Sequence, residues 1–180
     1  LPFIRLGDAM PENDSFSLWE MRHYGRHELY LRTNLGLEIP KGYLPSATGG
    51  SSPYTGDRMY QSLKYRYDFR DRIRVNLTAE KDAGEPWWSR EVPGFISASL
   101  QLRSVAGFDN LVLGDFTAGF GQGLVLRQGF RRSKSSLATQ IMNTGGGFRR
   151  YASTNEHPFF RGIAATRQFS DFTVHAFASH

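Results

Sequence analysis

The side chains best suited to chemistry are basic ones, and the glycine-rich segment 121–158 concentrates them. Aromatic side chains interleave with these cations at Phe130, Phe148 and Tyr151. Cations attract phosphate groups and aromatic rings stack on nucleic-acid bases, so this mixture is a candidate polyanion contact. We prefer the alternative of a loop that meets anionic lipopolysaccharide or lines a lumen. The basic residues concerned are Arg127, Arg131, Arg132, Lys134, Arg149 and Arg150.

The other motifs do not predict an enzyme. Gly119, Gly121 and Gly123 precede basic residues, but the G-K-[ST] ending of a phosphate loop is missing. The five histidines lack the spacing of metal ligands, and the absence of cysteine excludes disulfides and thiolate sites. No Ser/His/Asp arrangement can be assembled. The sequence therefore predicts no catalytic residue, no metal ligand and no cofactor.

Between Met59 and Asp82 the sequence alternates between apolar and polar residues. A period of two is the signature of a β-strand whose two faces meet different surroundings. The apolar face should carry the odd positions 63, 65, 67, 73, 75 and 77. The opposite, polar face should carry the charged residues Lys64, Arg66, Asp68, Arg72, Arg74 and Glu80.

Similar alternation predicts strands elsewhere, so that residues 27–180 form one series of strands. Residues 1–26 are assigned to a plug-like lead-in or to a first strand, and no helical periodicity is visible. The further strands are expected at 27–37, 95–103, 111–120, 160–169 and 172–179. The long loops between strands are expected at 38–58, 81–94 and 121–158.

Register predicts the two clearest hairpins, since opposing residues must share a face. A two-residue turn at Ser170-Asp171 sets Phe169 opposite Phe172 and Ala165 opposite Ala176. A three-residue turn at 69–71 sets Asp68 opposite Arg72.

Loop lengths read long, short, long, short, long, short along the chain. This order is typical of an up-and-down antiparallel barrel with tight turns at one end. The polar face carries too many charges for the interior of a small dry barrel. We therefore expect an all-β, antiparallel transmembrane β-barrel in a bacterial outer membrane, in contact with the lipid bilayer and lipopolysaccharide. The apolar, odd-numbered face should then meet lipid, the charged residues of the polar face should face the lumen, and the long loops should be extracellular. The alternative is a soluble β-sandwich or lipocalin-like barrel.

The strand count and the charge refine this expectation. Seven or eight strands, with a chain that stops in mid-pattern at "FTVHAFASH", suggest an incomplete segment of a larger barrel. The net charge of +5 comes from 22 basic and 17 acidic residues, which is a mixed surface and not a basic arm.

Three stretches resemble a known group of proteins: "LTAEKDAGEPWW" (77–88), "LVLGDFTAGFGQGLVLRQGF" (111–130) and "STNEHPFFRGIAAT" (153–166). Together they resemble the barrel region of large outer-membrane proteins of the Bacteroidota type, which are named helix-hairpin-helix domain-containing proteins. The resemblance implies a membrane β-barrel preceded by a small helix-hairpin-helix module. That module is absent from this sequence, so its association with nucleic acid cannot be assigned to any residue here.

Three functions from different classes follow as expectations. The first is a non-enzymatic barrel that acts as a channel or as a scaffold with other envelope proteins, with a basic lumen that favours anions. The second is a component of DNA or polyanion uptake, with nucleic acid as a possible but less favoured partner. The third is a barrel enzyme of the outer-membrane lipase or protease kind.

Overall fold

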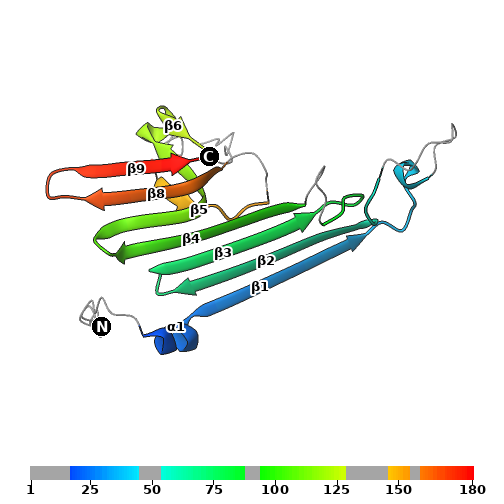
Figure 1. Cartoon of the computed structure of the whole chain (residues 1–180), viewed down its shortest axis with the longest axis horizontal. Helices are drawn as coiled ribbons and strands as arrows, with labels where there is room; N and C mark the ends of the chain where they lie inside the picture. The colour runs from blue at the N-terminus through cyan, green and yellow to red at the C-terminus, as the bar shows by residue number, and fades with distance from the viewer. Residues whose placement is uncertain (1–16, 45–53, 88–93, 129–145, 155–158) are drawn as a thin grey trace, which may run out of the picture.

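The computed structural model describes residues 17–44, 54–87, 94–128, 146–154 and 159–180, which form an antiparallel β-sheet with one short α-helix (Figure 1). The prediction of an all-β antiparallel fold is confirmed. The elements of this described part are α1 (Leu18–Tyr24), β1 (Arg26–Leu35), η1 (Lys41–Tyr43), β2 (Met59–Phe69), β3 (Ile73–Lys81), β4 (Phe95–Val105), β5 (Phe108–Phe120), η2 (Gly121–Gly123), β6 (Leu126–Arg127), β7 (Gly147–Arg150), β8 (Phe160–Gln168) and β9 (Thr173–Ser179).

The strands follow one another across the sheet in the order β1-β2-β3-β4-β5-β8-β9, while β6 and β7 both pair with β5. Within the described residues β1 and β9 are not paired with each other, so the sheet is open. The turns β2–β3, β4–β5 and β8–β9 lie together at one end of the sheet, and the longer connections lie at the other (Figure 1).

One predicted hairpin is confirmed and the other is wrong in its register. Ala165 faces Ala176, and the Phe169 N–H donates to the Phe172 carbonyl at 2.8 Å, as predicted. Between β2 and β3, however, Asp68 faces Arg74 and not Arg72. The turn occupies residues 70–72 because Phe69 still pairs with β3, and Arg74 then forms ion pairs with Asp68 on β2 and with Asp71 in the turn.

The two faces of the sheet differ in polarity. In a water-soluble protein the exposed side chains are mostly polar and the buried ones mostly apolar, and in this sheet the order is reversed. On the open face, apolar side chains are exposed: Leu63 by 41%, Leu77 by 45% and Ile163 by 54%. On the other face, which we call the covered face, polar side chains are buried. They are Ser62, Asn76, Thr78, Ser97, Ser99 and Gln101.

Strands β6 and β7 fold back from the end of β5. The short helix η2 turns the chain so that Leu126 pairs back with Phe120. Strand β7 then pairs with residues 116–119. Around β7 the covered face becomes apolar, with a buried cluster of Val112, Phe116, Ala118, Phe148 and Ala164.

Helix α1 lies within residues 1–26, for which the sequence predicted either a lead-in or a first strand. Ser17 caps the helix by accepting a hydrogen bond from the Trp19 N–H at 3.3 Å, and the chain leaves it at Gly25. The Tyr67 hydroxyl donates to the Met21 carbonyl at 2.8 Å and joins the helix to β2. Among the described residues, no helix combines the length and the apolar character that crossing a membrane requires.

Candidate functional site

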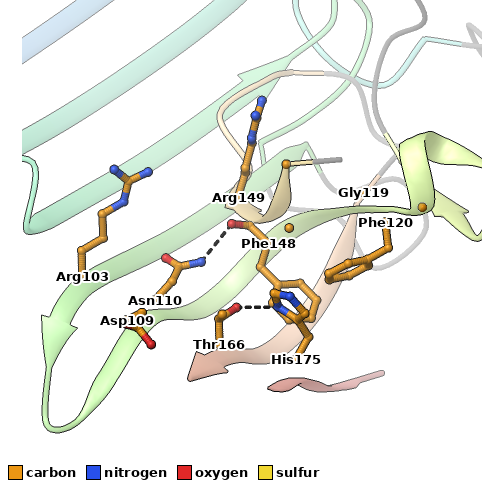
Figure 2. A pocket seen from close by; sticks show the side chains of 12 residues that line it. Arg103, Asp109, Asn110, Gly119, Phe120, Phe148, Arg149, Thr166 and His175 are labelled. Carbon is orange, nitrogen blue, oxygen red and sulfur yellow. Dashed lines mark hydrogen bonds between the residues drawn. The ribbon is translucent and has the colours of Figure 1, made fainter. Parts of the chain in front are cut away.

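The short segment of β7 and Tyr151 is attached to the covered face by buried hydrogen bonds. The Tyr151 carbonyl accepts from Asn76 Nδ2 at 3.2 Å and from Ser99 Oγ at 3.0 Å. The Tyr151 N–H donates to the Asp115 carbonyl at 2.8 Å. Asn110 Nδ2 donates to the Phe148 carbonyl at 3.0 Å (Figure 2). Because these partners belong to β3, β4 and β5, β7 is fixed across the face and its side chains are held in place.

Arg150 of β7 lines a cavity of about 350 Å³ against β1, β2 and β3, which we call the Arg150 cavity. All three carboxylates of the cavity already have arginine partners. Glu28 pairs with Arg26. Arg74 pairs with Asp71 and with Asp68, the latter at 2.6 Å between Nε and Oδ2. The remaining cations of the cavity are Arg66 and Arg150.

Arg150 shares this cavity with three other arginines, Arg26, Arg66 and Arg74. Arg66 stacks over the Tyr30 ring at 5.6 Å, and its Nε is buried without a hydrogen-bond partner. Among the described residues that line the site there are thus four arginines and three carboxylates, an excess of one positive charge, and neither Arg66 nor Arg150 forms an ion pair.

A second cavity of about 640 Å³ shares Arg66 with the first, and we call it the Lys64 cavity. It lies over β1 and β2, and the described residues that line it include three cations, Arg32, Lys64 and Arg66, and no carboxylate. Arg32 stacks over the Tyr60 ring at 5.5 Å. Stacking on tyrosine holds a guanidinium in position and leaves its edge available for an anion.

A third cavity of about 590 Å³, the His175 cavity, lies between β5, β7, β8 and β9 (Figure 2). The His175 ring packs against Phe120 with 4.8 Å between centroids, and its Nδ1 lies 2.9 Å from Thr166 Oγ1. A hydroxyl beside an imidazole would need an acid to orient the ring for nucleophilic catalysis. The nearby Asp109 carboxylate instead accepts the Gln168 N–H. The contacts seen here therefore make His175 part of an aromatic lining.

The structure brings part of the two predicted basic sets together. Arg66, Asp68 and Arg74 meet Arg150 in one cavity, and Lys64 lines the adjoining one. Two predicted lumen residues have other contacts. Glu80 accepts a hydrogen bond from the Tyr60 hydroxyl at 2.8 Å, and Arg72 Nη2 donates to the Ser104 carbonyl at 2.7 Å.

The rest of the predicted polyanion contact does not join this cluster. Arg127 and Arg149 are exposed, and Arg149 lines the His175 cavity. Arg131, Arg132 and Lys134 lie outside the described residues.

Sequence reasoning did not assign the β1 residues that complete the site. The two basic cavities are also lined by four residues of β1 that pair with β2 and share a face with its even-numbered residues. They are Arg26, Glu28, Tyr30 and Arg32. The signal was present in the alternation of β1, which places these even-numbered residues on one face. In the part of the chain that the structure describes, no group of three His, Cys, Asp or Glu side chains could hold a metal ion.

Comparisons with protein-family models, with curated proteins and with solved structures find no match for this chain. The resemblance to helix-hairpin-helix outer-membrane proteins therefore stays a prediction.

Proposed function

We propose that this chain forms part of the wall of an outer-membrane β-barrel that acts as a channel or scaffold and not as an enzyme. One observation carries the proposal: over β2, β3 and β4 the open face is apolar and the covered face is polar. Leaving leucine and isoleucine in water costs about 25 cal/mol per Å² of apolar surface, whereas lipid removes that cost. Transmembrane barrels have this arrangement, with apolar side chains outside and polar side chains inside.

The ends of the strands support the same placement. Phe169 and Phe172 stack at 4.8 Å beside the last short turn and are both exposed, which suits an aromatic girdle at a membrane interface. Phe69, which also flanks a short turn, is fully buried and does not belong to such a girdle. In this proposal the Arg150 and Lys64 cavities lie in the lumen, and their excess of cations favours anions.

Single cysteines can test the placement directly, since the sequence contains none. Leu77 and Thr78 are neighbours on β3, one exposed on the apolar face and one buried on the other. The variants Leu77→Cys and Thr78→Cys would each be labelled with bimane after refolding into brominated-lipid vesicles. We expect strong quenching of the label at residue 77 and little at residue 78. Equal quenching at both positions, or recovery of the protein as a soluble detergent-free monomer, would reject the proposal.

Planar-bilayer recordings separate the channel from the scaffold. A channel with this lining should conduct and should show anion selectivity in asymmetric salt. Absence of conductance, together with bimane quenching at residue 77, would leave the scaffold. Cation selectivity would reject the anion channel.

Polyanion uptake is the second candidate, because Arg127 and Arg149 are exposed and thus accessible to a large ligand. Binding of single-stranded DNA should then weaken with salt, and the variant Arg149→Gln should reduce the slope of log K against log salt by about one unit. An unchanged slope would remove Arg149 from the contact.

A further inference from the structure

The Arg150 cavity contains an electrostatic imbalance that its own side chains do not resolve. Its carboxylates, Glu28, Asp68 and Asp71, are all engaged by Arg26 and Arg74. Arg66 and Arg150 line the same cavity of about 350 Å³, and among the described residues neither forms an ion pair; the four arginines and three carboxylates of the lining leave one positive charge in excess. Two like charges in a partly buried site repel each other, and an anion between them would remove that repulsion.

The Arg66 guanidinium and the strand that carries Arg150 are held by contacts that do not depend on each other. Arg66 lies over Tyr30, and its buried Nε has a free hydrogen. Arg150 is the last residue of β7, whose backbone is fixed by the buried hydrogen bonds of the adjacent Tyr151. An anion that enters the cavity would therefore meet an ordered Arg66 guanidinium and a fixed backbone at Arg150, which lowers the entropy cost of binding.

We propose that Arg66 and Arg150 together bind a small oxyanion, a phosphate or a carboxylate, in the Arg150 cavity. The planar guanidinium donates two parallel hydrogen bonds, which match the spacing of two oxygens on one phosphorus or carbon atom. A chloride ion has a single acceptor centre and therefore does not match two parallel hydrogen bonds as well as an oxyanion does. The location of the site in a lumen rests on the proposed function, whereas the binding itself does not.

Isothermal titration calorimetry on the intact protein in detergent micelles tests this site. Inorganic phosphate and acetate are the two probes, titrated separately at constant ionic strength with chloride as the background anion. We expect saturable binding of at least one of them, with affinity at least about tenfold weaker in Arg66→Gln and in Arg150→Gln. Arg150→Lys should also weaken binding, because lysine keeps the charge but loses the paired donors.

The matched control is Arg167→Gln, which removes the same charge from an exposed arginine on β8 that stacks over Phe169, away from both basic cavities. It should bind the probe as the unmodified protein does. The proposal is overturned if neither probe binds, or if Arg167→Gln weakens binding as much as Arg150→Gln. Bimane quenching at residue 77 is unaffected by either outcome, so failure of the oxyanion site is distinguishable from failure of the membrane placement. Far-ultraviolet circular dichroism of each variant checks that it is folded.

Discussion

Arg161 binds the Asp115 carboxylate with two hydrogen bonds, from Nε at 2.7 Å and from Nη2 at 2.9 Å, at the point where β4 and β5 separate. The backbone ladder between these strands ends at the pair Ser99–Gly114. Beyond it, Asp115 accepts the Ala98 N–H at 3.3 Å and Arg161 donates to the Ile96 carbonyl at 2.9 Å. Where the backbone hydrogen bonds between β4 and β5 have ended, the side chains of Asp115 and Arg161 thus bind the backbone of β4 instead.

The two members of this pair should not be equally costly to lose. Asp115 is buried, whereas the Arg161 side chain is 56% exposed. Arg161→Leu leaves a buried carboxylate uncompensated and should lower the free energy of unfolding by about 3 kcal/mol. Asp115→Asn leaves only a half-exposed cation and should cost less. Urea unfolding in detergent micelles measures both, and a larger cost for Asp115→Asn would contradict this account.

Gly114 permits the separation of the two strands. Its φ of +87° lies in the region that favours glycine, and a Cβ there would lie 2.2 Å from the Ala98 carbonyl oxygen. Gly114→Ala should therefore destabilise the protein by about 2 kcal/mol or more, through backbone strain and the clash together. Gly119→Ala on the same strand is the control, since its Cβ would meet its nearest neighbour at an ordinary 3.8 Å. Similar unfolding midpoints for the two variants would show that Gly114 is not under this constraint.

The attachment of β7 depends on Asn76. This buried side chain donates to the Tyr151 carbonyl, and Asn76→Ala removes that hydrogen bond, which is worth about 1 kcal/mol. We expect faster hydrogen exchange at the Tyr151 amide, which bonds to Asp115, with little change in the β2–β3 ladder. Asn34→Ala, at an exposed position on β1, should leave the exchange of Tyr151 unchanged. Unchanged exchange in Asn76→Ala would mean that β7 is held by its other contacts alone.

Stability should fall at acid pH partly through Asp57, which pairs with the buried Lys81 next to the start of β2. Hydrogen bonds from Lys81 and from the Met59 N–H hold the pKa of the Asp57 carboxyl below its ordinary value of 3.8. Because the folded-state pKa is lowered, this pair stabilises the protein above the unfolded pKa. That contribution is lost as the pH falls through the folded-state pKa.

The variant Asp57→Asn isolates this contribution. It should be less stable than the unmodified protein at pH 6, and the difference between the two should shrink below pH 4. Unfolding midpoints in urea at pH 6, 5, 4 and 3 provide the measurement. A difference that stays constant over this range would show that the Asp57 carboxylate does not carry the effect.

Alternation in the sequence was sufficient to predict β1 to β5, β8 and β9 and their faces, whereas β6 and β7 lie within the predicted loop 121–158. Period two places Leu63 and Leu77 on one face and Asn76 and Thr78 on the other, whichever strands become neighbours, because the direction of a side chain depends only on local backbone geometry. Helix α1 was not predicted, because seven residues are too few to show a period of 3.6 residues. Its local signals were the cap at Ser17, Glu20 in the first turn and Gly25 at the end of the helix.

Only the tertiary structure decided three features: the register of the strands, the hydrogen bonds by which side chains bridge separated strands, and the proximity of charges that are distant in the sequence. The alternation of faces allowed Asp68 to face either Arg72 or Arg74. In the structure Asp68 faces Arg74, which forms ion pairs with Asp68 and with Asp71. The sequence likewise determined that residues 121–158 are basic, but not that Arg150 would lie beside Arg66. That proximity depends on hydrogen bonds from β3 and β4 to Tyr151, between residues 75 and 52 positions apart. Such contacts form only when the chain has folded, and no local pattern of residues encodes them.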